Sequence, residues 1–248
     1  MKKYKKLKDQ ITAWGELFFK NRINLPFLLI PFFILFIFMD HAGGGAEAKA
    51  FVWKIICLFV SLTGYIVRII VVGTSPKNTS GRNTKRQKAD CLVTKGFYSV
   101  VRNPLYLANI IILTGFALFA GDITAWLLTI MLAYFYYEKI IFVEEEFLAQ
   151  KFQKEFELWA QKTPMLFPQW GAWKASGRAF DLKRVLRKEY PGLMVIGMTF
   201  FGLNFIQDCF IYQRIYLDPF WSWFVIAVFM IWLILRTLKK YTKLLKSR

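Results

Sequence analysis

The chain alternates between long apolar runs and segments rich in basic and polar residues. Six apolar runs stand out, at residues 25–39, 51–72, 105–120, 124–143, 192–212 and 219–235. A run of about 20 mainly apolar residues crosses a bilayer as a helix, because a helix satisfies its own backbone polar groups in lipid. The pattern therefore predicts an all-α integral membrane protein with about six transmembrane helices. The first run is short, and Pro26 and Pro31 are expected to bend it.

Two segments outside these runs carry apolar side chains at mixed three- and four-residue spacing. The first lies at 11–19, close after a lysine-rich start, and the second at 147–159. This spacing predicts amphipathic helices that lie on the membrane surface. Pro164 and Pro168 are expected to stop the second helix.

These elements divide the chain into four parts. A basic interfacial segment covers 1–24 and two membrane helices cover 25–73. A core made of a loop, a helical hairpin and an amphipathic helix covers 74–170. The last part, 171–248, is expected to hold a basic linker, two further membrane helices and a basic tail. The connection at 121–122 is so short that the helices on either side must be antiparallel neighbours.

Composition agrees with a membrane protein. The chain is 56% hydrophobic, which is too apolar for a soluble fold of 248 residues. Its net charge of +18 raises the question of nucleic acid, but the Lys and Arg residues lie mainly beside the apolar runs. The pattern therefore indicates a membrane and a lipid as partners, and no nucleic acid. Basic residues concentrate at both ends and in 74–102 and 144–190, which predicts that both termini are cytoplasmic.

Metal and disulfide chemistry have no sequence signal. The three cysteines are scattered without a CxxC pair, and the only histidine, His41, lies in a Gly/Ala-rich segment. Neither a disulfide framework nor a metal site is expected.

The candidate chemistry gathers where the loop before the third apolar run meets that run. Arg102 and Asn103 precede Pro104, and an Asn N-cap followed by Pro is a common helix start. Free backbone N–H groups and a guanidinium there predict an anion-binding corner. One hairpin later the chain returns with the acidic cluster at 144–146. The alternative is that these charges only flank membrane helices at the interface.

Glu138 is a second acidic candidate, inside the fourth apolar run. Steps of four and seven residues place Tyr134, Glu138 and Glu145 on one helix face. A carboxylate in lipid is costly and is a candidate functional group. The alternative is a structural pair with Lys139, Lys54 or Arg68.

The combination resembles the isoprenylcysteine carboxyl methyltransferase family of membrane-embedded enzymes that use S-adenosylmethionine. The resemblance rests on residues 92–98, 102–106, Gly115, Glu144, Glu145, Leu148, Phe152, Pro164 and Pro168. The chain departs from the family pattern at Asn103, where the family usually has His, at Gln153, where it has Gly, and at Phe156 and Trp159, where it has Tyr.

The resemblance implies a site near the cytoplasmic face that binds S-adenosylmethionine. The implied cofactor-binding residues are Val93, Gly96, Tyr98, Arg102, Asn103, Pro104, Tyr106, Glu144 and Glu145. Together with helix geometry, it makes Arg102, Glu138 and Glu145 the candidate catalytic residues. Tyr98, Tyr106, Tyr134 and Tyr137 are candidates for cation–π contact with a sulfonium.

Methyl transfer from a sulfonium needs alignment, a place for positive charge and a dry site more than it needs acid–base groups. An amine acceptor must lose a proton, whereas a carboxylate or phosphate is already ionised at neutral pH. The sequence offers no histidine at the site, so it predicts O-methylation of an anionic lipid or lipidated substrate. The resemblance implies a prenylcysteine carboxylate, and a phosphorylated glycolipid fits the charge equally well.

Two other classes are the alternatives. One is a nicotinamide-dependent reductase of similar architecture, and the other is a transporter or scaffold without enzymatic activity. The sequence has no GxGxxG after a strand and no matching pair of Gly/Pro-broken runs.

Overall fold

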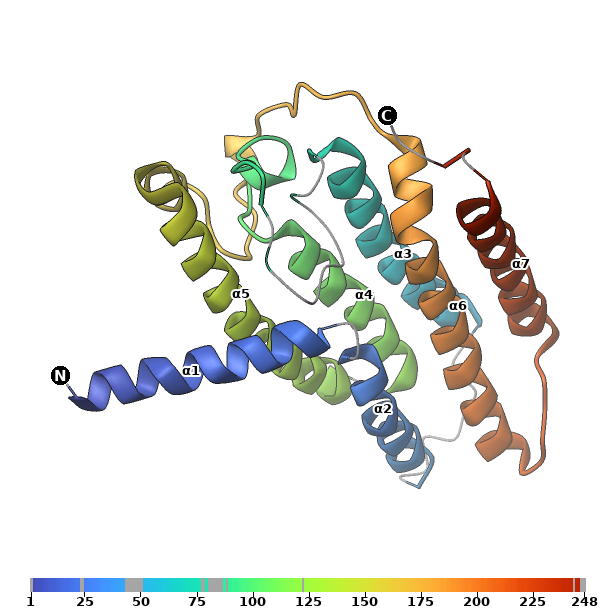
Figure 1. The fold of residues 1–248 in the computed structure, drawn as a ribbon. Helices are drawn as coiled ribbons and strands as arrows, with labels where there is room; N and C mark the ends of the chain where they lie inside the picture. The colour runs from blue at the N-terminus through green and yellow to red at the C-terminus, as the bar shows by residue number, and fades with distance from the viewer. Residues whose placement is uncertain are drawn as a thin grey trace.

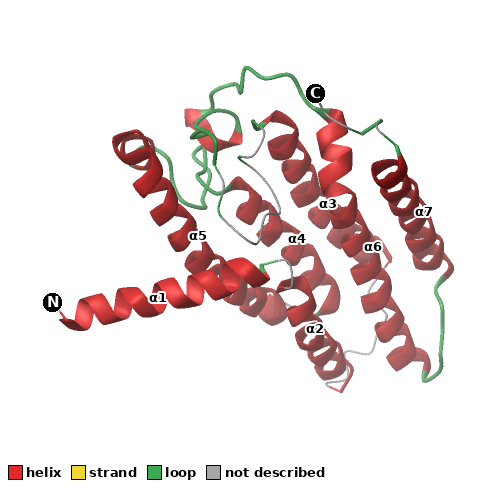
Figure 2. Cartoon of the chain, in the orientation of Figure 1, coloured by secondary structure: helices red, strands yellow, loops and turns green. Residues whose placement is uncertain are grey.

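A computed structural model describes residues 2–22, 25–42, 51–76, 79, 87, 89–121, 123–242 and 244–245. Its helices are α1 (Lys2–Asn21), α2 (Leu25–Ala42), α3 (Phe51–Thr74), α4 (Pro104–Ala120), α5 (Ile123–Ala160), α6 (Leu182–Tyr212) and α7 (Pro219–Tyr241), with single 3₁₀ turns at Phe97–Ser99 and Trp170–Ala172. The described residues contain no strand (Figures 1 and 2), which confirms the all-α prediction.

Four helices, α3, α5, α6 and α7, are long and apolar enough to cross a membrane. They coincide with four of the six predicted runs. The other two runs also fold as helices, but their apolar stretches, Leu28–Met39 and Pro104–Ala120, are shorter. The structure therefore supports a multi-pass membrane protein, and its described residues hold four helices of spanning length where about six were expected. The predicted Gly/Ala loop lies largely outside the described residues, and α2 continues through Ala42.

Two helices, α5 and α6, are longer than predicted. The fourth run and the amphipathic helix after it form one helix, α5, because no Pro or Gly separates them. Gln153 interrupts α5 with φ 43° and ψ −120°. The same position carries Gly in the resembling family, and Gly alone adopts such angles without strain. In α6 the helix begins at Leu182, ahead of the predicted start, and holds Pro191 in its interior.

Helices α4, α3, α6 and α7 stand side by side, with α5 against α4 and with α1 lying across α5 (Figure 1). The α3–α4 contact is the closest because small residues line it. A Cβ atom on Gly64 would lie 2.6 Å from the carbonyl oxygen of Ala108. Ser61 donates a hydrogen bond to the carbonyl of Ile112 at 2.8 Å. Small residues of this kind let membrane helices approach closely.

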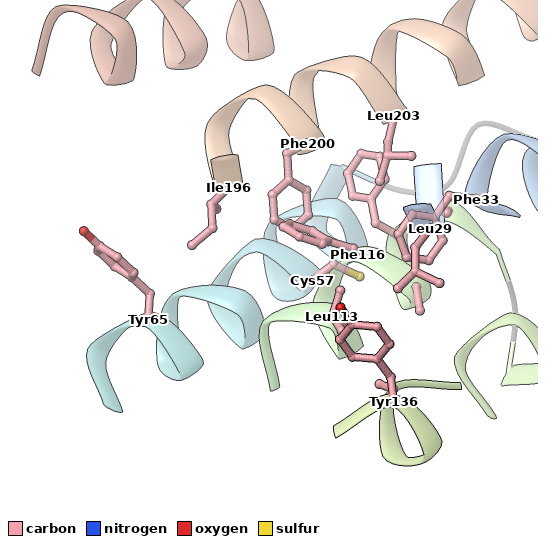
Figure 3. Packing of buried hydrophobic residues seen from close by; sticks show 14 of the residues in the cluster. Leu29, Phe33, Cys57, Tyr65, Leu113, Phe116, Tyr136, Ile196, Phe200 and Leu203 are labelled. Carbon is pink, nitrogen blue, oxygen red and sulfur yellow. The ribbon is translucent and has the colours of Figure 1, made fainter. Parts of the chain in front are cut away.

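Aromatic side chains fill the centre of the bundle. Phe116 of α4 lies edge-on to Phe200 of α6, with ring centroids 5.2 Å apart, and Phe200 stacks on Trp221 of α7 at 5.8 Å. Figure 3 shows Phe200 and Leu203 projecting from α6 toward Phe116 and Phe33. This packing fixes α6 against α4, an arrangement on which the site depends.

Candidate active site

A cavity of about 500 Å³ lies at the end of the bundle where α3 finishes and α4 and α6 begin. This volume is typical of a small-molecule site. Its described walls come from six parts of the chain: the end of α1 (Phe19, Arg22), α3 (Tyr65, Arg68, Val72), the loop between α3 and α4 (Thr79, Gln87, Ala89, Cys91, Leu92, Val93, Tyr98, Arg102, Asn103), α4 (Pro104, Leu105, Tyr106, Asn109, Ile112, Leu113, Phe116), α5 (Tyr137, Glu144, Phe147, Leu148, Trp159) and α6 (Lys188, Glu189, Gly192, Val195, Ile196).

The loop before α4 is held by its backbone. Gly96 adopts φ 66°, in the region that favours glycine, and its N–H donates to the carbonyl of Lys174 at 2.8 Å. Asn103 and Pro104 begin α4 as predicted, but the Asn103 side chain makes no cap hydrogen bond. Its amide donates instead to Glu145 Oε1 at 3.0 Å. The predicted helix start is therefore present, but the Asn103 side chain is hydrogen-bonded to α5 and does not cap α4.

Arg102 links three segments. Its Nε and Nη2 donate to the two oxygens of Glu145 at 2.8 and 3.1 Å, a bidentate pair. Its Nη1 donates to the carbonyls of Ala160 and Thr163, both at 2.8 Å. These contacts tie the loop to α5 and to the turn after it. Four of the five N–H donors of Arg102 are thus used inside the protein, so its main task in this structure is to hold the cavity wall.

Glu144 faces the cavity and pairs with Arg22. The Arg22 Nη1 donates to Glu144 Oε1 at 2.6 Å and to the Tyr106 hydroxyl at 3.2 Å. Arg22 arrives there because α1 packs closely on α5, where a Cβ atom on Gly15 would lie 2.5 Å from the Lys139 carbonyl oxygen. The helix that precedes the predicted membrane runs therefore supplies a cation to the site.

A second ion pair borders the cavity between α3 and α6. Arg68 donates to the two oxygens of Glu189 at 2.9 and 3.1 Å and to Asn109 Oδ1 at 2.6 Å. The Tyr65 hydroxyl donates to the Glu189 carbonyl at 3.0 Å. The Glu189 side chain is only 2% exposed. This network fixes the start of α6 to the end of α3.

The Tyr98 hydroxyl stays neutral. Burial raises the pKa of Tyr98 well above its ordinary value, and the nearby Glu144 carboxylate raises it further. A hydrogen bond with Ser75 opposes these effects in part. Tyr98 therefore offers the cavity an aromatic face and a neutral hydroxyl, and it cannot act as a base near neutral pH.

The structure brings most of the predicted site residues to one cavity. Val93, Tyr98, Arg102, Asn103, Pro104, Tyr106 and Glu144 line it. Among the described residues, Gly96 and Glu145 lie behind the lining, where Gly96 shapes the loop and Glu145 holds Arg102.

Glu138 is not brought to the described part of the lining. Its carboxylate is paired with Lys139 at 2.7 Å and is 37% exposed, which is the structural pairing raised as the alternative. The cavity stripe of α5 runs through Tyr137, Glu144 and Leu148, so it is turned by one residue from the predicted face. One residue corresponds to 100° on a helix, enough to separate the two faces.

Sequence reasoning did not identify Arg22, Asn109, Lys188 or Glu189 as site residues. Arg68 interrupts an apolar run, and Glu189 comes just before another. An ionisable residue within or beside a membrane helix is a functional candidate, so the sequence positions of Arg68 and Glu189 could have identified them. Arg22 had none, because it looks like one more basic residue at a membrane interface.

Comparisons with known proteins agree with a methyltransferase core. Residues 56–155, less than half of the chain, match the phospholipid methyltransferase family model. A cobalt-zinc-cadmium resistance protein of Cupriavidus metallidurans and a nickel-cobalt-cadmium resistance protein of Alcaligenes xylosoxydans are each 32% identical over 83 residues, which cover 34% of this chain. The chain matches 38% of the length of each of these relatives. No solved structure matches.

The family match covers most of α3, all of α4 and most of α5, and it includes Arg68, Arg102, Tyr106 and Glu144. Arg22 and the whole of α6 lie outside it. The core of the cavity thus comes from a segment, residues 56–155, that is similar to the phospholipid methyltransferases, a family of membrane methyltransferases.

Proposed function

We propose that the protein is a membrane methyltransferase that moves a methyl group from S-adenosylmethionine to an anionic oxygen, a carboxylate or a phosphate, of a lipid or lipidated substrate. The match to phospholipid methyltransferases supports methyl transfer to a lipid. The charges and the neutral phenols around the cavity support the cofactor and the anionic acceptor.

The residues present suit a sulfonium cofactor. A sulfonium is stabilised by carboxylates and by aromatic faces. Glu144 lines the cavity, and the Tyr106 and Tyr137 rings lie 4.9 Å apart beside it. Glu144 would hold the cationic part of the cofactor, the tyrosine rings would face it, and Val93 and Leu148 would add apolar contact. When bound, S-adenosylmethionine supplies a methyl group on a positively charged sulfur.

The observation that carries the anionic acceptor is a lining rich in cations and poor in bases. Its described ionisable side chains include three arginines and Lys188, against the carboxylates of Glu144 and Glu189. Both carboxylates are already paired with arginine, Glu144 with Arg22 and Glu189 with Arg68. Methyl transfer to an ionised oxygen releases no proton, so such a lining needs no base.

The remaining residues position the reaction. The Arg102–Glu145 pair holds the loop that carries Tyr98 against α5. Tyr137, which is only 2% exposed, excludes water from the inner wall, which strengthens the electrostatic contacts there. Glu138 has no part in this proposal, because it lies in a surface pair with Lys139.

We further propose that the cavity lies at the cytoplasmic side. The described parts of two basic segments, 89–102 and 161–190, lie at this end of the bundle, and α7 ends there with Lys239 and Lys240 in its last turn. Figure 1 places the end of α7 beside the start of α6, at the same end of the bundle as the end of α3. A reporter fused to the C-terminus should read cytoplasmic, and an external signal would reverse this assignment.

The function is tested with S-adenosylmethionine labelled in its methyl group, detergent-purified protein and fractionated membrane lipids. Transfer of label to lipid is expected. Release of labelled methanol by mild alkali would identify a carboxyl ester, and mass spectrometry would identify a phosphate ester. Label on nitrogen would overturn O-methylation. Titration with NADPH is the counter-test, because binding of NADPH without binding of S-adenosylmethionine would favour a reductase.

A further inference from the structure

The cavity has two unlike sides. Its polar side holds Arg22, Tyr106 and Glu144. On the other side, between α4 and α6, lies an apolar lobe made of Ile112, Leu113, Phe116, Val195 and Ile196. A pocket for the cofactor and a charged group alone would not need this second side.

The lobe is closed at its inner end. Leu113, Phe116 and Ile196 are each 2% exposed or less. Phe200 packs behind Phe116 with ring centroids 5.2 Å apart. Figure 3 shows Ile196 and Phe200 projecting from α6 toward the side chains of α3 and α4. An apolar group that enters this lobe would therefore meet Ile196 and Phe116 as its end wall.

Helix α6 is built to present this wall. The Arg68–Glu189 pair fixes its first turns against α3. Pro191 lies inside the helix, and the next residue, Gly192, lines the cavity without a side chain. Gly192, Val195 and Ile196 follow at three- and four-residue spacing, which places them on one face. Helix α6 lies outside residues 56–155, the segment that matches phospholipid methyltransferases.

We infer that the apolar lobe binds the hydrocarbon chain of the lipid acceptor, and that Ile196 determines how long a chain fits. This inference rests on the proposed function only in taking the acceptor to be a lipid. A chain in the lobe places its anionic head toward Arg22. Each buried methylene contributes about fourfold in affinity, so the depth of the lobe becomes a preference for chain length.

The experiment measures binding of lysophosphatidic acids with ten-, fourteen- and eighteen-carbon chains to the full-length protein by native mass spectrometry, without S-adenosylmethionine. Ile196→Phe should shorten the lobe and lower the affinity for the eighteen-carbon probe about tenfold relative to the ten-carbon probe. Ile196→Ala should shift the preference toward longer chains. The matched control is Met198→Phe, two residues along α6 and 50% exposed, which should leave the preference unchanged.

The same chain-length preference in wild type and in both Ile196 variants would overturn the inference, as would an equal shift in Met198→Phe. If Ile196→Phe does not fold, Ile196→Ala alone decides. The proposed function fails separately. A chain-length shift without any methyl transfer would support hydrocarbon binding in the lobe and reject the methyltransferase function. Methyl transfer without a chain-length shift would support the methyltransferase function and reject hydrocarbon binding in the lobe.

Discussion

Helices α3 and α6 are joined by two buried ion pairs that look alike in sequence. Arg68 pairs with Glu189 near the cavity, and Lys54 pairs with Asp208 about four helical turns away along α3. Each joins a cation of α3 to a carboxylate of α6. All four side chains are 13% exposed or less.

Their surroundings differ. Lys54 donates to Asn204 Oδ1 at 2.6 Å, and Asn204 donates to Asp208 Oδ2 at 2.6 Å, in a region packed against Phe119. The described lining of the cavity includes none of these residues, whereas it includes both Arg68 and Glu189. A buried charge in a membrane helix is thus a functional candidate only where it borders space for a ligand. Elsewhere it fixes helix register.

The largest expected effect comes from Glu189→Gln. It leaves the Arg68 guanidinium without its carboxylate, which should cost about 3–5 kcal/mol of folding free energy and abolish methyl transfer. Asp208→Asn is the matched variant, and Lys54 keeps the Asn204 oxygen there. We expect it to cost about 1–3 kcal/mol without changing activity per folded molecule. Thermal unfolding in detergent and methyl transfer measure both. If Asp208→Asn lost more specific activity than Glu189→Gln, the distinction between a ligand-bordering pair and a purely structural pair would be wrong.

Arg102→Lys should have the next largest effect. Lysine keeps the charge but loses the planar fork that holds Glu145 and two carbonyls. We expect turnover to fall about 10- to 100-fold, since each lost charge-assisted bond is worth about 1.5–3 kcal/mol. Asn103→His, which restores the usual family residue, should be tolerated. Full turnover in Arg102→Lys would show that the loop does not depend on this fork.

The three carboxylates of the acidic cluster at 144–146 differ in whether they face the cavity. Sequence alone predicts the largest loss of cofactor affinity for Glu145→Gln, with Glu144→Gln intermediate. The structure reverses this order, because Glu144 lines the cavity and Glu145 lies behind Arg102. Glu144→Gln should weaken S-adenosylmethionine binding by about one to two decades. Glu146→Gln should do little, since its pair with Lys8 lies at the surface. Calorimetric titration of the three variants decides the order.

Tyr98 gives a smaller effect that depends on pH. Its pKa is raised in the folded protein, so the neutral form stabilises the fold fully below the unfolded pKa of about 10. That stabilisation is lost as the pH rises above about 10, by up to about 1.4 kcal/mol per pH unit. Tyr98→Phe cannot ionise, so the stability difference between the two proteins should narrow above pH 10. A constant difference would show that Tyr98 is not buried.

The smallest expected effect is a gain. Gln153→Gly places glycine at φ 43° and ψ −120°, where strain on a residue with a side chain costs about 1 kcal/mol or more. We expect the unfolding midpoint in detergent to rise slightly with no loss of methyl transfer. A lower midpoint would mean that the Gln153 side chain stabilises the kink more than its backbone strains it.

The sequence by itself determined the elements. Apolar runs and their spacing gave the helices, and the helix start at Pro104 followed from local chemistry. Val93, Tyr98, Tyr106 and Glu144 were expected at the site, and they line the cavity. The continuation of α5 past residue 143 was missed, although no Pro or Gly ends the helix there. The early start of α6 at Leu182 was missed because a helix can continue past an unfavourable residue, here Pro191, when tertiary packing supports it.

Only the tertiary structure decided which charges meet. Arg22 and Glu144 are 122 residues apart in the chain, and Arg68 and Glu189 are 121 apart, so no local pattern relates them. The face of α5 that borders the cavity is offset by one residue from the predicted face. Glu144 therefore lies in the cavity lining, and Glu138 lies at the surface. Side-chain periodicity defines the faces of a helix, but the packing of its neighbours selects the face that borders the site.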